Sequence, residues 1–147
     1  MANSIRDQVI NSITAAMLAS TGIITATNDL RNWYDYDPHE FPVVTVLDRD
    51  TDIQRLCFKS TTNADKIGMM NVVIRGYVQD TNNVTKLKRT NLIRDIQKKM
   101  EAGTSTMNSL IFDFHDDTIE TDDGLIDGYS VFDLSYTVKY HYNHLVP

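Results

Sequence analysis

Hydrophobic and polar residues alternate most strictly in the C-terminal stretch Tyr129–Tyr142. The apolar and aromatic positions are Phe132, Leu134, Tyr136, Val138, Tyr140 and Tyr142, and the polar positions between them are Asp133, Ser135, Thr137, Lys139 and His141. A period of two residues is typical of a β-strand that buries one face and exposes the other to water. We therefore predict a long strand here, and we expect the other elements to cover its apolar face.

A longer period predicts a helix near the N-terminus, over Ser4–Ala19. Its apolar residues recur at the spacing of one helical stripe, and they are Ile5, Val9, Ile10, Ile13 and Met17. Ser4 is placed to cap this helix, and Asp7 lies in its first turn, beside the positive helix end. Gly22 is expected to take the left-handed conformation that ends many helices.

A second helix is predicted over Val84–Ala102, and we expect Gly103 to end it. Its apolar side is formed by Leu87, Leu92, Ile93, Ile96 and Met100. The remaining surface of this helix is rich in Lys and Arg. Both helices therefore have one apolar face that suits packing against a sheet.

Shorter apolar runs predict further strands. They are Phe41–Leu47, Ile53–Phe58, Met69–Val78 and Leu110–Phe114, with a shorter one around Ile23–Ala26. Gly76, inside one of these runs, indicates a bulge or a close backbone approach. The order is helix, strands, helix, strands. It predicts an α+β fold, with a mostly antiparallel or mixed sheet and two amphipathic helices packed on one face.

Aromatic and acidic residues alternate in Trp33-Tyr34-Asp35-Tyr36-Asp37. An aromatic cluster that stacks on nucleic-acid bases usually has cations nearby, but here only Arg31 is close in sequence. We expect these aromatic side chains to anchor a loop to the core or to lie at a subunit boundary.

Length and charge narrow the possible functions. The chain has 147 residues, for which one domain over residues 1–147 is the default expectation. Its formal net charge is −6, which argues against broad binding to nucleic acid or to anionic membranes, because both need a positive field. The single cysteine, Cys57, permits no disulfide within the chain. No apolar run is long enough for a membrane-spanning helix, and we expect no signal peptide.

No catalytic or metal-binding motif is convincing. The run Asp48–Asp52 begins like a calcium loop, but Ile53 stands where glycine is needed and Lys59 where glutamate is needed. His141 and His144 lie three residues apart, so in an extended chain they point to opposite faces. Gly-rich phosphate loops, zinc-protease motifs and nucleophile elbows are missing. We therefore expect a protein that is not an enzyme and has no cofactor or metal.

Opposite charges gather on two separate segments. The second predicted helix carries Lys86, Lys88, Arg89, Arg94, Lys98 and Lys99. The segment after the strand Leu110–Phe114 carries Asp113, Asp116, Asp117, Glu120, Asp122, Asp123 and Asp127, with no Lys or Arg before Lys139. The dipeptide Asp123-Gly124 favours a hairpin turn. We expect this segment to form an acidic hairpin or arm that leads to the last strand.

The whole chain resembles the tail terminator, or tail completion, proteins of long-tailed bacteriophages. The elements that carry this resemblance are the helix Ser4–Ala19, the strand opened by Pro42-Val43-Val44-Thr45-Val46, the strand Asn71–Val78, the helix around Leu92-Ile93-Arg94-Asp95-Ile96 and the long last strand ending in Tyr140-His141-Tyr142. The acidic segment 113–127 and the aromatic segment 33–36 are not part of that pattern.

The resemblance implies a structural virion protein at the tail–neck junction, assembled in the host cytoplasm. Such proteins form homohexameric rings on the head-proximal end of the tail tube. The ring stops tube polymerisation, contacts the tail tube protein and offers a surface to head-completion proteins, while DNA passes through its hole without specific binding. Whether a sheath protein is also contacted stays open, and no membrane is involved.

The charge pattern suggests how a ring would form. A ring needs two different patches on each subunit, and opposite charges on separate elements set the direction of association. The candidate interface residues are Lys86, Lys88, Arg89, Lys98, Lys99, Asp116, Asp117, Glu120, Asp122 and Asp123. A second hypothesis places the acidic arm in the hole, where it would keep DNA from sticking. Another neck, connector or tube subunit, a small cytoplasmic adaptor and an unrecognised hydrolase remain as alternatives.

Overall fold

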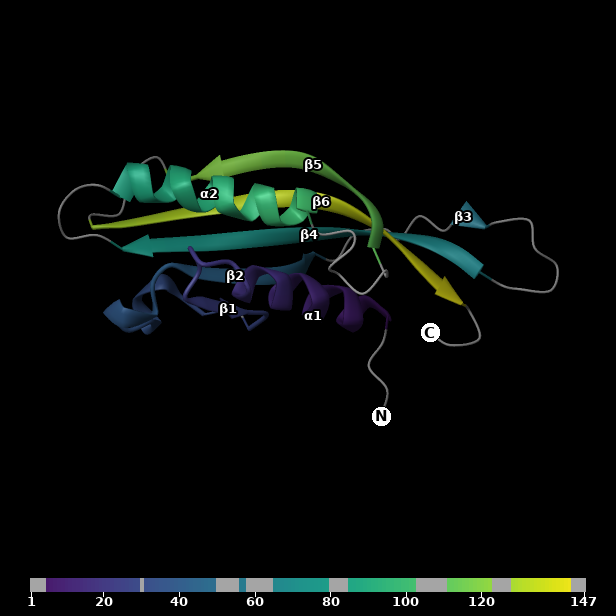
Figure 1. Cartoon of the computed structure of the whole chain (residues 1–147), viewed down its shortest axis with the longest axis horizontal. Helices are drawn as coiled ribbons and strands as arrows, with labels where there is room; N and C mark the ends of the chain where they lie inside the picture. Colours follow the sequence, from purple (N-terminus) through teal and green to yellow (C-terminus); the bar gives the residue numbers. More distant parts are fainter. Residues whose placement is uncertain are drawn as a thin grey trace.

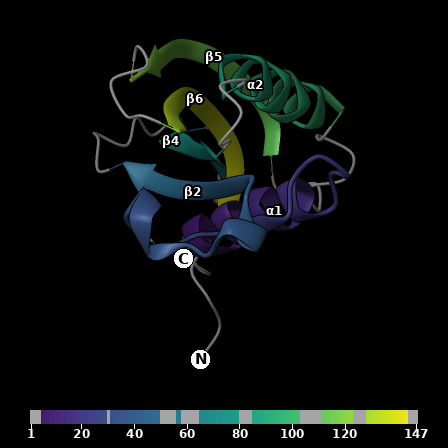
Figure 2. The ribbon, with the colours of Figure 1, turned by 90° about the vertical axis from the view of Figure 1, so that its left-hand side faces the viewer.

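Two helices lie on one face of a curved, mixed sheet in the computed structural model of the protein (Figures 1 and 2). The structure describes residues 5–29, 31–49, 56–57, 65–79, 85–102, 111–122 and 128–143. Its elements are α1 (Ile5–Leu18), β1 (Thr25–Thr27), the 3₁₀ turns η1 (Trp33–Asp35) and η2 (Pro38–Glu40), β2 (Val43–Arg49), β3 (Leu56–Cys57), β4 (Asp65–Gln79), α2 (Thr85–Ala102), β5 (Ile111–Thr121) and β6 (Tyr129–Asn143). The α+β prediction is confirmed.

The strands follow the order β1-β2-β4-β6-β5, and β3 pairs with the far end of β4. Among the described strand pairs, only β1 and β2 run parallel, and the others are antiparallel. β4 and β6 form the centre of the sheet and pair along their whole length, from Asp65 opposite Asn143 to Gln79 opposite Tyr129. Figure 1 shows these two strands extending past the helices toward β3. The long C-terminal strand is therefore confirmed, and it pairs with a second strand of equal length.

The apolar faces of both helices pack against the apolar face of the sheet. α1 contributes Val9, Ile10, Ile13 and Met17, and α2 contributes Leu92, Ile96 and Met100. The sheet contributes Val44, Val46, Met70, Val72, Ile74, Val78, Ile111, Phe132, Leu134, Tyr136, Val138 and Tyr140. Leu87 was expected on the buried side of α2, and this is wrong, because its side chain is 61% exposed in the first turn of the helix.

Gly22 does not take the predicted left-handed conformation, since Gly128 is the only described glycine with a positive φ. α1 ends at Leu18, and the Ser20 backbone N–H donates to the carbonyl oxygen of Met17 at 3.0 Å. Gly22 instead lies close to a side chain of α2. A Cβ atom at this position would overlap the carboxylate of Asp95 on α2.

The face of the sheet opposite the helices, called the outer face below, has a smaller apolar cluster of its own. Tyr36 is buried there, with its ring centroid 6.2 Å from that of Phe41 and 5.9 Å from that of Tyr77. The Tyr77 hydroxyl donates to the backbone carbonyl of Arg31 at 2.9 Å. The expectation that aromatic residues anchor the loop is confirmed for Tyr36, while Tyr34 is exposed.

The acidic segment is mostly strand. The predicted strand Leu110–Phe114 continues as β5 to Thr121 and pairs antiparallel with β6, so the hairpin is built from two long strands. Among the described residues β5 lies at the edge of the sheet. Its pairing with β6 shifts at two bulges, between Ile111 and Asp113 and between Asp116 and Thr118. Acidic side chains and bulges are usual on edge strands, because they discourage sheet extension.

Several expectations fall outside the described residues. They include the cap at Ser4, most of the strand Ile53–Phe58, the helix end at Gly103 and the turn at Asp123-Gly124. The strand predicted at Met69–Val78 is longer than expected, since β4 spans Asp65–Gln79.

Two glycines of β4 lie under aromatic rings of β6. Gly76 is directly opposite Phe132, and Gly68 is directly opposite Tyr140. A Cβ atom at either glycine would overlap the facing ring. At Gly76 the strand has no bulge, and the group that approaches closely is the Phe132 ring and not another backbone. Aromatic rings that cover glycine backbone in this way help to fix strand register.

We predict that Gly76→Ala destabilises the fold by about 1–3 kcal/mol, because the new methyl group overpacks against Phe132. Urea unfolding of the two proteins measures the difference. In a Phe132→Leu background the same change should become neutral or stabilising, because alanine lowers the entropy of the unfolded chain by about 0.4–1 kcal/mol relative to glycine. An equal cost in both backgrounds would contradict the contact.

Candidate subunit interface

Helix α2 presents most of its cations to solvent. Lys88, Arg94 and Lys98 are exposed, and Lys99 is partly buried. The backbone of Lys86 lies in the first turn of α2, but its side chain is outside the described part of the structure. Arg94 and Lys98 lie one turn apart and make no hydrogen bond or ion pair with any other residue that the structure describes. α2 therefore offers an exposed positive surface on the helix side of the molecule.

The acidic residues of β5 divide between the two faces of the sheet, because side chains alternate along a strand. Glu120 is opposite Asp133 and Asp113 is opposite Lys139, all on the outer face. Asp116 is opposite Tyr136 and lies on the helix side. The side chains of Asp117 and the whole of Asp123 lie outside the described residues. We expected one acidic surface, but the described acidic side chains of β5 form two, one on each face of the sheet.

Two of the candidate interface residues pair within the chain. The Arg89 guanidinium lies 3.5 Å from Asp122 Oδ1, and it donates to the Ser130 hydroxyl at 3.2 Å. The Ser130 hydroxyl lies 3.3 Å from the same Asp122 oxygen. The Arg89 and Asp122 side chains are only 16% and 11% exposed. This contact ties the start of α2 to the end of β5.

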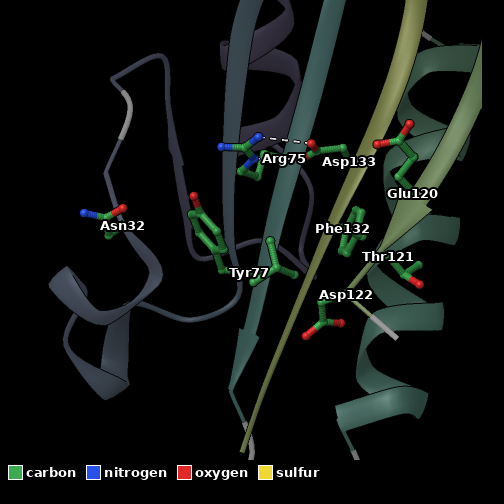
Figure 3. A pocket seen from close by; sticks show the side chains of 9 residues that line it. Asn32, Arg75, Tyr77, Glu120, Thr121, Asp122, Phe132 and Asp133 are labelled. Atoms are coloured by element: carbon green, nitrogen blue, oxygen red, sulfur yellow. Dashed lines mark hydrogen bonds and ion pairs between the residues drawn. The ribbon is translucent and has the colours of Figure 1, made fainter. Parts of the chain in front are cut away.

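A second ion pair crosses the centre of the outer face. Arg75 on β4 is directly opposite Asp133 on β6. Its Nε and Nη2 donate to the two Asp133 oxygens at 2.7 and 3.0 Å, which is a bidentate arrangement (Figure 3). This carboxylate raises the pKa of Arg75 above its already high ordinary value. Burial raises the pKa of the neighbouring Tyr77 hydroxyl.

The outer face is hollowed beside this pair, in a trough of about 360 Å³. Its floor includes Arg75, Tyr77 and Asp133, and its walls include Asn32 on one side and Glu120 and Asp122 on the other. Figure 3 shows the walls coming from the loop near η1 and from the end of β5. Sequence reasoning missed this site. The available signal was a charged residue in the middle of an apolar strand, Arg75, with an acid at the facing position.

A smaller groove of about 160 Å³ lies on the helix side, between α2 and β5. Its lining includes Gln97, Asp116, Ile119 and Tyr136. Ile119 is 54% exposed, since α2 covers the centre of the sheet and leaves the β5 edge open. Burial raises the pKa of the Tyr136 hydroxyl, and the nearby carboxylates of Asp116 and Glu101 raise it further.

The described residues contain no cluster of three or more His, Cys, Asp or Glu side chains that could hold a metal ion. Asp48, the first residue of the calcium-like run, accepts a hydrogen bond from Arg6 Nε at 3.1 Å. Residues 50–52 of that run lie outside the described part, as do Ile53, Lys59, His144 and the side chains of Cys57 and His141. No helix in the described residues is long and apolar enough to cross a membrane.

Neither a family model nor a curated protein matches the sequence. Among solved structures, the fold is similar to a chain in the virion of a native gene transfer agent particle. The TM-score is 0.42 and the identity 9%, over 95% of this chain and 92% of that chain.

Tyr136 yields a pH prediction. Its folded pKa lies above its ordinary value near 10, so the folded state holds this proton more tightly than the unfolded state does. The contribution to stability is complete below pH 10 and is lost as the pH rises above it. Above pH 10, the wild-type free energy of unfolding should therefore fall more steeply than that of Tyr136→Phe, by up to about 1.4 kcal/mol per pH unit. Urea unfolding of both proteins at several pH values above 10 tests this prediction. If the two free energies of unfolding fall in parallel with pH, the prediction is wrong.

Proposed function

We propose that this protein is a structural virion component that acts as a tail terminator. In this proposal copies of the chain form a ring, a hexamer by the family resemblance, on the head-proximal end of a tail tube. The ring ends tube polymerisation, and its opposite side receives head-completion proteins at the tail–neck junction. It carries no catalytic chemistry.

The observation that supports self-assembly is the separation of opposite charges. Arg94 and Lys98 are exposed on α2, while Glu120 is exposed on the outer face of the sheet. None of these three side chains pairs with another described residue of its own chain. Two complementary surfaces on different sides of one subunit form a heterologous contact, which is the kind that closes rings. Opposite charge then sets the direction of association.

Charge alone would not hold such a ring together. An exposed ion pair contributes about 0–1 kcal/mol, so apolar contact has to supply most of the affinity. Two large apolar side chains are exposed on the helix side: Leu87 on α2, in the same stripe as Arg94 and Lys98, and Ile119 on β5 beside α2. In the proposed ring these side chains lose their water contact.

Electron microscopy of the purified protein distinguishes the proposal from related structural roles. A terminator should give closed rings of one size, and a tube subunit should give open-ended stacks. When the protein is added to growing tail tubes, rings should sit at one tube end and stop elongation. A protein that neither forms rings nor stops tubes would contradict the proposal and favour an adaptor role.

We predict that Arg94→Gln with Lys98→Gln weakens ring formation without unfolding the subunit, because both side chains are exposed. The sedimentation coefficient reports assembly, and circular dichroism reports the fold. The matched control is Ala15→Glu with Ala19→Glu, which changes the net charge equally at exposed positions at the end of α1. Equal loss of rings in both variants would show that net charge, and not the α2 surface, governs assembly.

A further inference from the structure

We propose that the trough on the outer face is the socket for α2 of a second copy of this chain. In this arrangement Arg94 and Lys98 of one copy enter the trough of the next and meet Glu120. The inference rests on the proposed function, because it specifies how neighbouring subunits of the ring recognise each other.

The trough suits a cationic side chain. The carboxylates of Glu120 and Asp133 face the trough together with one cation, Arg75, whereas the Asp122 carboxylate is turned to Arg89 and Ser130 on the helix side. Asp133 is engaged by Arg75 through two hydrogen bonds, and Asp122 by Arg89. Glu120 forms no ion pair with any residue in the described ranges, and it stands exposed on the wall (Figure 3). The net negative charge favours Lys or Arg over an anion.

The floor is rigid and partly apolar. Tyr77 is buried, and its hydroxyl is held by the carbonyl of Arg31. The bidentate Arg75–Asp133 pair fixes the other side of the floor. An alkyl stem of lysine or arginine can lie along such a surface while its charged end reaches a carboxylate. A preorganised socket also limits the entropy lost on binding.

α2 has the matching shape and charge. Arg94 and Lys98 are four residues apart, so they project from the same side of the helix, with Cβ atoms about 5–6 Å apart. This side is turned away from the buried stripe of Leu92, Ile96 and Met100. The pair forms a compact ridge that is free of ion pairs to the described residues.

The two surfaces lie on opposite faces of the subunit. α2 covers one face of the sheet (Figure 2), and the strand register places Arg75, Asp133 and Glu120 of the trough on the other face. One chain cannot bring its own α2 into its own trough. Association through these surfaces is therefore head to tail, and each added subunit again presents one free ridge and one free trough until the ring closes.

A charge-swap experiment tests the socket. Glu120→Lys alone and the pair Arg94→Glu with Lys98→Glu alone should each leave the protein monomeric, because like charges then meet. Mixing the two variants should restore rings with the wild-type mass, since every contact in an alternating ring again joins opposite charges. Mass photometry of each sample and of the mixture measures assembly, and circular dichroism confirms that the subunits are folded.

Asp116→Lys is the matched control. It makes the same change of charge on the same strand, but Asp116 lies on the helix side and does not line the trough. Its rings should keep the wild-type mass. Rings formed by Glu120→Lys alone, a monomeric mixture, or loss of rings in the control would each overturn the socket. If wild-type rings form in those cases, the proposed function stands; if the wild type neither forms rings nor stops tube growth, the proposed function fails as well.

Discussion

The pairing of β4 with β6 is the constraint on which the rest of the structure depends. The two strands are in register from Asp65 opposite Asn143 to Gln79 opposite Tyr129. A slip of one residue would turn every apolar side chain of β6 away from the helices. Gly76 under Phe132 and Gly68 under Tyr140 oppose such a slip, because each ring fits only over a residue that has no side chain. The register thereby determines which residues face α1 and α2.

The same register determines the chemistry of the outer face. It places Arg75 opposite Asp133 and, through the next strand, Glu120 opposite Asp133. One guanidinium, that of Arg75, thus lies in line with two carboxylates, and the net charge of this row is negative. On the other side of the sheet, the buried stripe of α2 leaves Arg94 and Lys98 in solvent. Strand pairing and helix periodicity therefore give the subunit two faces of opposite charge.

Sequence periodicity predicted the elements well and the surfaces less well. Alternation along Tyr129–Tyr142 and the helical stripes identified the core, because burial imposes a strict pattern on side chains. Gly22 was misinterpreted, since a sequence does not reveal that a distant residue, Asp95, lies close to a glycine. The acidic segment was expected as one surface. Its division between two faces, and the pairing of Asp122 with Arg89, depend on a long edge strand whose extent a charged sequence does not indicate.

In the proposed ring, opposite charges on two faces of the subunit join copies of the chain head to tail. Light scattering of the purified protein across a salt series tests it most directly. We expect one closed multiple of the 16.8 kDa chain at low salt, with a mass that does not grow with protein concentration. That mass should fall toward the monomer as salt screens the exposed charges. A monomer at every salt concentration would contradict charge-directed assembly. So would an oligomer whose mass does not change with salt.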